Sequence, residues 1–89
     1  MVNVEKKTID EKLSSLSFHV HHFPGTTCTV AIAVMPDGFV TGTGKSACID
    51  PSLFDKGTGY DIAITNARAD AEQRLWELEG YHLKQNTLL

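Results

Sequence analysis

The chain lacks an excess of positive charge. Its 89 residues carry 8 Lys and Arg against 11 Asp and Glu, which gives a net charge of −3. Duplex nucleic acid and anionic membrane surfaces attract proteins through clustered positive charge, so we expect neither as a partner. The sequence also has no apolar run near the ~20 residues of a membrane span, and no basic segment before an apolar one at its start. We therefore expect a cytoplasmic protein.

Residue patterns typical of reactive or catalytic sites are also scarce. Cys28 and Cys48 form no Cys-x-x-Cys pair and lie in apolar, strand-like stretches. We interpret them as buried thiols, and a disulfide is possible only if those strands are neighbours. Residues 38–46 superficially resemble a phosphate-binding P-loop, but five residues instead of four separate Gly38 from Gly44. No Ser-His-Asp, Cys-His or isolated carboxylate-pair pattern emerges, so we predict no enzyme, no catalytic residue and no cofactor.

The cluster HVHH places His19 and His21 on one face of a predicted strand, where they could be two ligands of a metal. Further ligands are missing nearby, apart from His82 near the C-terminal end. We interpret the pair as solvent-exposed or interface histidines and predict no metal site.

Residues 60–80 predict one amphipathic helix that ends at Gly80. Its predicted buried face consists of Ile64, Ala67, Ala71, Leu75 and Leu78. A second stripe flanks that face and consists of Ile62, Asn66, Ala69, Gln73 and Trp76. Because one small sheet covers only one stripe, we expect the second to meet a partner chain or a ligand.

The preceding residues predict one short helix and three strands. Thr8 and Glu11 fit a capping box that starts a helix through Leu16 and buries Ile9, Leu13 and Leu16. Alternating hydrophobicity predicts strands over 17–23, 27–35 and 39–49, with turns at Pro24-Gly25 and Pro36-Asp37-Gly38. The central strand has one small face (Thr27, Thr29, Ala31, Ala33), which suits close approach by a helix or a second sheet. In the third strand, Gly42 and Gly44 indicate a bulge.

Together these elements predict an α+β fold. A three-stranded antiparallel meander is packed by one long C-terminal helix, with a short N-terminal helix, in a single domain of residues 1–89. We expect residues 1–7 to be flexible and residues 81–89 to form a tail that docks on the core or on a second subunit. Domains of this size often gain stability by association, so we expect a homo-oligomer, either a dimer or a larger assembly.

The candidate ligand-binding residues are cations, aromatics and one amide. Arginine recognises phosphate through two parallel hydrogen bonds and an aromatic plane stacks on a base, as a small anionic nucleotide requires. Asn66 lies in the middle of the helix, where it costs helix propensity, so it is either solvated or has a partner. We expect Trp76 to pack against the sheet. The predicted site consists of Phe54, Asn66, Arg68, Arg74, Tyr81 and Lys84.

A set of landmarks between Phe23 and Lys84 resembles that of a family of small proteins from tailed phages and prophages. The landmarks are Phe23 to Thr27, Gly38-Phe39, Ser46 to Pro51, Phe54-Asp55, Leu75-Trp76 and Glu79 to Tyr81. The chain is also similar in size, layout and the order Phe54, Asn66, Lys84 to the phage anti-defence "sponge" proteins that counter Thoeris immunity.

The resemblance to the sponges implies a non-enzymatic protein of the host cytoplasm that sequesters a nucleotide immune messenger. The messenger is a cyclic ADP-ribose isomer made by a TIR-domain enzyme, or alternatively a cyclic oligonucleotide. The resemblance further implies an adenine stacked on an aromatic, an amide at the ribose or base edge, and a cation at the diphosphate. We expect the pocket to lie between subunits. The alternative is a phage accessory protein that binds and inhibits a host protein through the exposed helix stripe.

Overall fold

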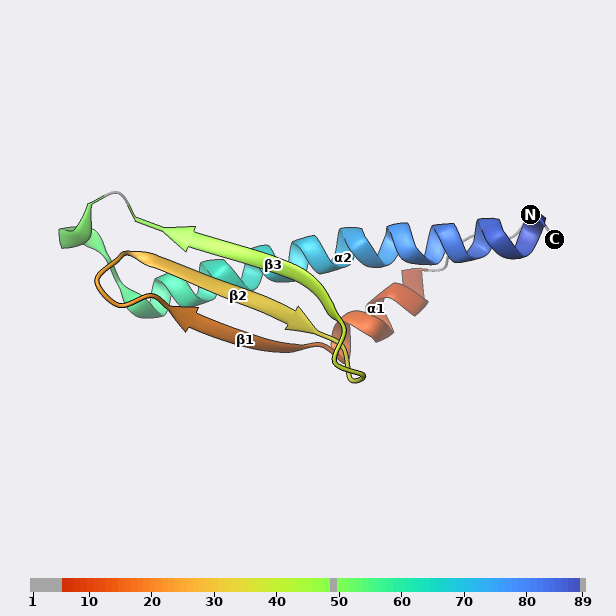
Figure 1. Ribbon diagram of the computed structural model, residues 1–89, viewed down its shortest axis with the longest axis horizontal. Helices are drawn as coiled ribbons and strands as arrows, with labels where there is room; N and C mark the ends of the chain where they lie inside the picture. Colours follow the sequence, from red (N-terminus) through yellow and green to blue (C-terminus); the bar gives the residue numbers. More distant parts are fainter. Residues whose placement is uncertain (1–5, 49, 89) are drawn as a thin grey trace.

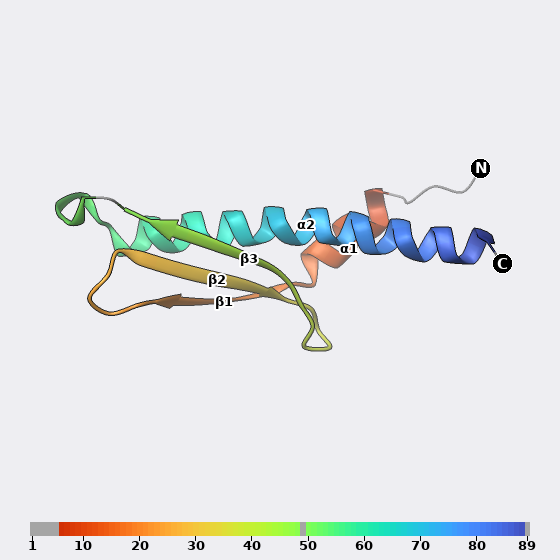
Figure 2. The ribbon, with the colours of Figure 1, turned by 45° about the horizontal axis from the view of Figure 1, so that its top comes forward.

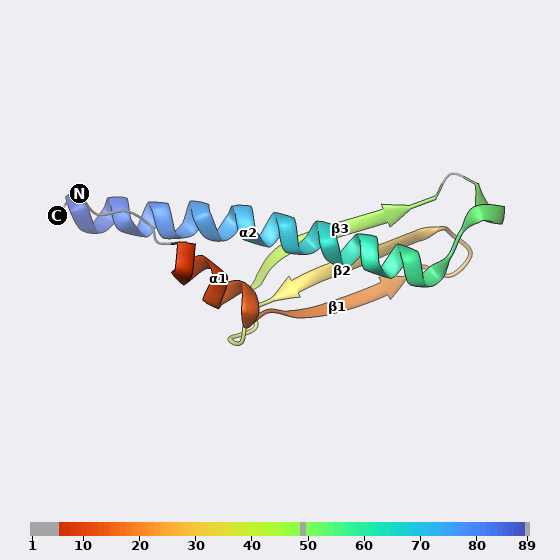
Figure 3. The same cartoon turned by 180° about the vertical axis from the view of Figure 1, so that it is seen from behind.

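The computed structural model describes residues 6–48 and 50–88 and has six elements (Figure 1). They are helix α1 (Lys6–Ser14), strands β1 (Ser17–His22), β2 (Cys28–Val34) and β3 (Val40–Ala47), the 3₁₀ turn η1 (Pro51–Leu53) and helix α2 (Lys56–Leu88). The strands form one antiparallel sheet in the order β1-β2-β3. Helix α2 runs across one face of this sheet, and α1 packs beside α2 (Figure 3). The predicted α+β fold is confirmed.

Both predicted hairpin turns form, and each uses a glycine in the left-handed region. The φ angle is 78° at Gly25 and 93° at Gly38, values that residues with a Cβ rarely adopt. In the second turn, the Gly38 N–H donates to the Met35 carbonyl at 2.8 Å, and the Met35 N–H donates to the Phe39 carbonyl at 2.8 Å. These turns set the register of the meander.

The core between sheet and helix consists of small side chains. Ala31 and Ala33 from β2 pack against Ala63, Ala67 and Ala71 from α2, and all five are fully buried. Thr29 on the same face of β2 is also buried. The predicted close approach to the small face of β2 is therefore confirmed, and of the two predicted partners, a helix or a second sheet, it is a helix.

The two glycines of β3 allow the helix to contact the strand through its backbone. A Cβ on Gly44 would lie 2.2 Å from the Ala67 nitrogen, and one on Gly42 would lie 2.5 Å from the Ala71 nitrogen. Such distances are far below van der Waals contact, so only glycine fits at either position. The predicted bulge also occurs, as a register shift between Ala33 and Val34, which pair with Gly42 and Val40.

A second hydrophobic cluster, made of larger side chains, lies where α1 packs against α2. Ile9 and Leu13 of α1 are buried against Leu75 of α2, and Lys12 forms an ion pair with Glu79. Leu16 is half-buried and packs against the same cluster. Helix α1 already begins at Lys6, before the predicted cap at Thr8; residues 1–5, which we expected to be flexible, lie outside the described residues.

Helix α2 is longer than predicted at both ends. It begins at Lys56 instead of Tyr60, and it passes through Gly80, so the predicted stop there is wrong. Gly80 does not adopt the left-handed conformation of a helix cap. The following residues include no proline, and the Gln85 side chain donates to the Tyr81 hydroxyl one turn earlier. The predicted tail therefore continues the helix.

The buried stripe of α2 also differs from the prediction. It advances in steps of four (Ala63, Ala67, Ala71, Leu75), and each such step rotates about 40° around the helix. Beyond Leu75 this stripe has turned away from the sheet. Leu78, predicted to be buried, is 42% exposed, and Trp76, predicted to pack on the sheet, is 37% exposed.

The molecule is elongated because α2 continues past both the sheet and α1 (Figure 2). Its principal extents are 56 × 23 × 19 Å and its radius of gyration is 16.1 Å, whereas a compact domain of this length has about 12 Å. None of the helices among the described residues combines the length and the apolar character that crossing a membrane requires.

The contact between α2 and β3 predicts opposite effects for two glycine substitutions. Gly44→Ala should lower the free energy of unfolding by more than about 2 kcal/mol, because its Cβ collides with helix backbone that cannot move aside. Gly57→Ala, whose Cβ would make only an ordinary contact at 3.8 Å, should leave stability unchanged or raise it by up to about 1 kcal/mol. Urea denaturation followed by circular dichroism measures both. Equal effects would contradict the direct backbone contact.

Candidate functional site

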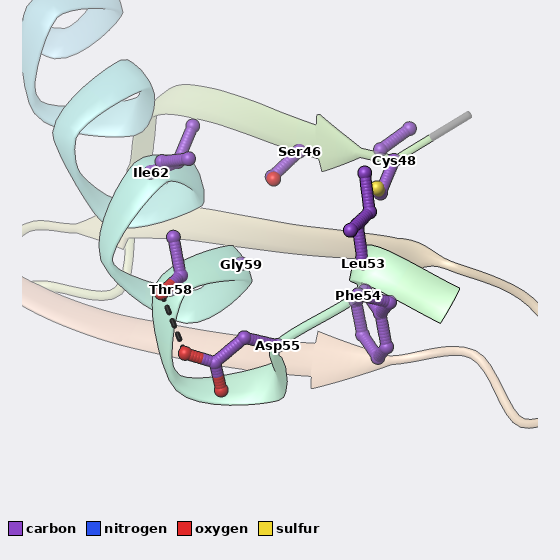
Figure 4. A pocket seen from close by; sticks show the side chains of 9 residues that line it. Ser46, Cys48, Leu53, Phe54, Asp55, Thr58, Gly59 and Ile62 are labelled. Carbon is purple, nitrogen blue, oxygen red and sulfur yellow. Dashed lines mark hydrogen bonds between the residues drawn. The ribbon is translucent and has the colours of Figure 1, made fainter. Parts of the chain in front are cut away.

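A surface pocket of about 260 Å³ lies between the end of β3 and the first turns of α2 (Figure 4). Its lining residues are Ser46, Ala47, Cys48, Leu53, Phe54, Asp55, Thr58, Gly59 and Ile62. The turn η1 brings Leu53 and Phe54 to this place. Asp50 shapes the turn, since its carboxylate accepts hydrogen bonds from the Ser52 N–H at 3.0 Å and the Ser52 hydroxyl at 2.8 Å.

Asp55 forms the polar wall of the pocket and caps α2. Its carboxylate accepts hydrogen bonds from the Thr58 hydroxyl at 2.7 Å and from the Gly57 N–H at 3.2 Å. The hydrogen bond from Thr58, followed by that from Gly57, holds the pKa of Asp55 below its ordinary value. Asp55 therefore acts as the N-cap of α2.

Phe54 supplies an aromatic wall. Its ring is half-buried and stacks on His22, with centroids 5.1 Å apart and planes inclined by 23°. A hydrogen bond fixes the orientation of the His22 ring, because its Nε2 lies 2.7 Å from the Thr26 carbonyl oxygen. A carbonyl can only accept, so Nε2 carries the proton of this hydrogen bond. One face of Phe54 is thus held by a fixed neighbour.

A buried hydroxyl lies behind the pocket. Thr29 is fully buried, and its Oγ1 has no hydrogen-bond partner among the described residues. It lies 3.2 Å from the position that a Cβ on Gly59 would take, and the Ser46 hydroxyl lies 3.9 Å from the same point. Buried hydroxyls are nearly always paired, so the unpaired Thr29 hydroxyl costs free energy of folding. It lies beside two of the residues that line the pocket, Ser46 and Gly59.

The cysteines do not approach a disulfide. Strands β2 and β3 are neighbours, but Cys28 lies on the open face of the sheet, whereas Cys48 lines the pocket on the helix side. Both are free and half-buried. The Cys48 thiol donates to the Asp50 carbonyl oxygen at 3.2 Å.

His19 and His21 are exposed on the open face of the sheet, opposite the face that α2 covers. Within residues 6–48 and 50–88, no three His, Cys, Asp or Glu side chains are grouped as metal ligands would be. Lys45 lies on the same open face, beside a shallow hollow that Val30 and Thr43 also line.

The six predicted site residues do not share one cavity within a single chain. Phe54 lines the pocket, whereas Lys84 lies near the opposite end of α2, about 42 Å beyond Lys56 at 1.5 Å per residue. The side-chain amide of Asn66 donates to the Lys45 carbonyl at 3.1 Å, so its partner is the edge of the sheet.

The other predicted residues lie along the length of α2. Arg68 is exposed. Arg74 lies 3.8 Å from Glu77 and lines a small hollow beside β3 together with Asp70. Tyr81 is 64% exposed and lies in the C-terminal turns of α2.

Sequence reasoning missed the partners of Phe54 in the pocket, chiefly Ser46, Thr58 and Ile62. Two signals were present. The pair Asp50-Pro51 is typical of a turn or short helix after a strand, and residues 56–59 (KGTG) are typical of a break before the long helix. The connection from β3 through η1 to α2 is short, so the start of the helix lies beside the end of the strand.

The fold and the pocket define a small α+β protein in which one long helix packs on a three-stranded meander and has a surface pocket beside its N-terminal end. The chain belongs to the phage protein (N4 Gp49/phage Sf6 gene 66) family, whose profile matches residues 4–87. This match confirms the expected membership of a family of small phage proteins. Neither a curated protein nor a solved structure matches the chain.

Two buried threonines predict opposite effects of the same substitution. Thr29→Val should raise the free energy of unfolding by about 1 kcal/mol, because it removes a hydroxyl that has no partner. Thr41→Val should lower it by about 1 kcal/mol, because the Thr41 hydroxyl donates to the Ala33 carbonyl at 3.2 Å. Both are measured by urea denaturation. Destabilisation by Thr29→Val would show that its hydroxyl is paired in solution.

The cap at Asp55 predicts a pH-dependent contribution to stability. Its lowered pKa means that the contribution is complete above the ordinary value of about 3.9 and is lost as the pH falls through the folded-state pKa below that value. Asp55→Ala should therefore lower the melting temperature at pH 7 and have a shrinking effect below pH 4. Asp61→Ala, at an exposed position further along α2, is the control and should have a smaller effect at pH 7. A pH-independent effect of Asp55→Ala would contradict the charged cap.

Proposed function

We propose that this phage protein binds and sequesters a nucleotide immune messenger of the host, in the host cytoplasm, without cleaving it. The messenger class is a cyclic ADP-ribose isomer of TIR-domain signalling or a cyclic oligonucleotide. The observation that supports this function is the pocket beside Phe54, which an aromatic ring and two hydroxyl side chains line. Membership of a phage protein family is consistent with an action against host defence.

The pocket suits the nucleoside part of such a ligand. Phe54 offers a ring for stacking, Leu53 and Ile62 add apolar surface, and Ser46 and Thr58 bring hydroxyls that can meet base or ribose edges. At about 260 Å³ the pocket lies below the range of pockets that enclose whole drug-sized ligands. It therefore holds a base and its ribose and leaves the phosphates outside.

The phosphates need a cation, and Asp55 is the one charged side chain among the described lining residues. Lys56 follows Asp55 directly, in the first turn of α2, and its Nζ lies 5.7 Å from the centre of the Tyr60 ring. We assign the phosphate contact to Lys56. Arg68, Arg74 and Lys84 lie about 18 Å or more further along the helix. Each chain accordingly carries its own binding site.

The state of the reactive groups near the pocket supports binding without turnover. The thiol of Cys48 donates to a backbone carbonyl, and the Nε2 of His22 is engaged with Thr26. A nucleophile requires an adjacent base that can take its proton, and these contacts direct both groups elsewhere. The ligand should therefore be recovered intact.

The test is a thermal-shift screen against cyclic ADP-ribose isomers and cyclic di- and trinucleotides, followed by mass spectrometry of the ligand. A binding nucleotide at 100 times its Kd should stabilise the protein by about 2.7 kcal/mol. Phe54→Ala should weaken binding by roughly 5- to 150-fold, the equivalent of one lost stacking contact of about 1–3 kcal/mol. Phe39→Ala is the matched control, since Phe39 is an exposed aromatic in the hairpin between β2 and β3.

A second pair of variants tests the phosphate contact. Lys56→Gln should weaken binding, whereas Lys84→Gln should not. A new product mass would make the protein an enzyme and overturn the proposal. No shift with any nucleotide would favour the alternative, a protein that inhibits a host protein through the outer stripe of α2, where Ile62 is 45% and Trp76 37% exposed.

A further inference from the structure

The hydroxyl of Thr29 is a buried donor beside the pocket. Thr29 is fully buried, and its Oγ1 forms no hydrogen bond within residues 6–48 and 50–88. Thr41, which is equally buried, donates to the Ala33 carbonyl at 3.2 Å. A buried donor that is left unpaired costs free energy, so the Thr29 hydroxyl gains more than an exposed one would from an acceptor supplied by a ligand.

Two side chains of the pocket wall lie next to this hydroxyl, around one point at Gly59. The point is the position that a Cβ on Gly59 would take. Of the described heavy atoms, the three nearest to it are the Thr29 Oγ1 at 3.2 Å, the Phe54 Cε2 at 3.5 Å and the Ser46 Oγ at 3.9 Å. Ser46 at the end of β3 and Phe54 and Gly59 at the start of α2 all line the pocket (Figure 4). The unpaired hydroxyl is therefore directly behind the pocket floor.

Gly59 is the reason that no side chain of α2 covers the Thr29 hydroxyl. Its φ angle is not in the left-handed region, so its conformation does not require a glycine. Alanine has a higher helix propensity than glycine, but its Cβ would lie 3.2 Å from the Thr29 Oγ1. The glycine thus leaves the hydroxyl next to the pocket without an apolar group in front of it.

The groups around this point favour an oxygen that accepts hydrogen bonds. The hydroxyls of Thr29 and Ser46 can each donate one. Cε2 is the only Phe54 atom among the three nearest, so the ring presents its edge, because a ring face would bring the adjacent carbons nearer than the Ser46 oxygen. The edge of an aromatic ring carries partial positive charge. A carbonyl oxygen suits all three groups, whereas an amino group would direct its hydrogens at the ring edge.

We propose that Thr29 and Ser46 form a subsite for the carbonyl oxygen of a nucleobase. The pocket then selects bases with an exocyclic oxygen, such as guanine, hypoxanthine and uracil, over adenine and cytosine. The base stacks on the face of Phe54 that is opposite His22, and the ring edge turns away from Gly59 as the oxygen enters. Phe54 is free to turn in this way because its ring is half-buried and lies in the connection between η1 and α2.

The subsite rests on the proposed function, since it assumes that the ligand of this pocket is a nucleotide. It also narrows the class of messenger. A cyclic ADP-ribose isomer offers only adenine, whereas cyclic oligonucleotides can contain guanine or uracil. The selected messenger is therefore a cyclic oligonucleotide with at least one such base.

Nucleotides that differ in one exocyclic group test the subsite. Inosine 5′-monophosphate carries an oxygen where adenosine 5′-monophosphate carries an amino group, and the uridine and cytidine monophosphates differ in the same way. Their dissociation constants are measured by NMR titration of the full-length protein, with the amide of Gly59 as the reporter. The member of each pair with the oxygen should bind at least about fivefold more tightly, the equivalent of one net hydrogen bond.

A threonine variant assigns this preference to the hydroxyl. Thr29→Val keeps the shape of the side chain and should raise the Kd of inosine 5′-monophosphate at least about fivefold. It should change the Kd of adenosine 5′-monophosphate by less than about twofold, so that the preference disappears. Thr41→Val is the matched control, since its hydroxyl is paired and it is not among the residues that line the pocket.

A glycine variant tests the access to the hydroxyl. Gly59→Ala should also abolish the preference, because its methyl group covers the Thr29 Oγ1. Gly80→Ala, at a helical position where a Cβ meets nothing within 4 Å, is the matched control and should keep the preference.

The outcomes separate the subsite from the proposed function. A wild type that binds both members of each pair equally, or binds neither, would overturn the subsite, and so would a Thr29→Val protein that keeps the preference. A cyclic nucleotide whose binding depends on Phe54 but not on Thr29 would leave sequestration intact and remove the subsite. A preference among the monophosphates without binding of any cyclic nucleotide would support the subsite and contradict sequestration.

Discussion

The rest of the structure depends on the direct contact between the backbones of α2 and β3. Gly42 and Gly44 leave no side chain between strand and helix, and Ala63, Ala67 and Ala71 add only methyl groups on the helix side. Alanines bury little apolar area each, so the stability of this core rests on many close contacts along a long interface. A helix that runs the length of the sheet supplies that interface, and its first turns reach the end of β3, where the pocket forms.

The packing of the helix on the sheet could be predicted, because a strand face made only of small residues needs a closely packed neighbour. Thr29, Ala31 and Ala33 on one face of β2 indicated close approach by a helix or a second sheet, and helix α2 lies there. The end of the helix could not be predicted in the same way. Gly80 is a stop only where the chain adopts the left-handed conformation, and the residues after it support continued helix equally well. Trp76 was expected on the sheet because large aromatics are usually covered, but the buried stripe advances by fours and turns away before reaching it.

The candidate site was predictable in part. Phe54 was identified from its chemistry, and it does line a pocket. Its neighbours Ser46 and Ile62 could not be identified, since they are brought together only by the way η1 folds α2 back on β3. The cations on α2 show the opposite case. Arg68, Arg74 and Lys84 suit phosphate by type, but a straight helix distributes them along its length, and no spacing rule on one helix can gather them around a ligand.

The separation of the two ends of α2 also bears on how a sequestering protein would work. Coupling between a ligand site and a subunit contact requires an element with two arrangements that both sites bias. Helix α2 connects the pocket to its own C-terminal turns, but Gly42 and Gly44 hold it against β3 with no side chain that could repack. A shift of the helix would have to break that backbone contact. Under the proposed function, each chain therefore binds one ligand in its own pocket, and the messenger removed rises in proportion to the protein present.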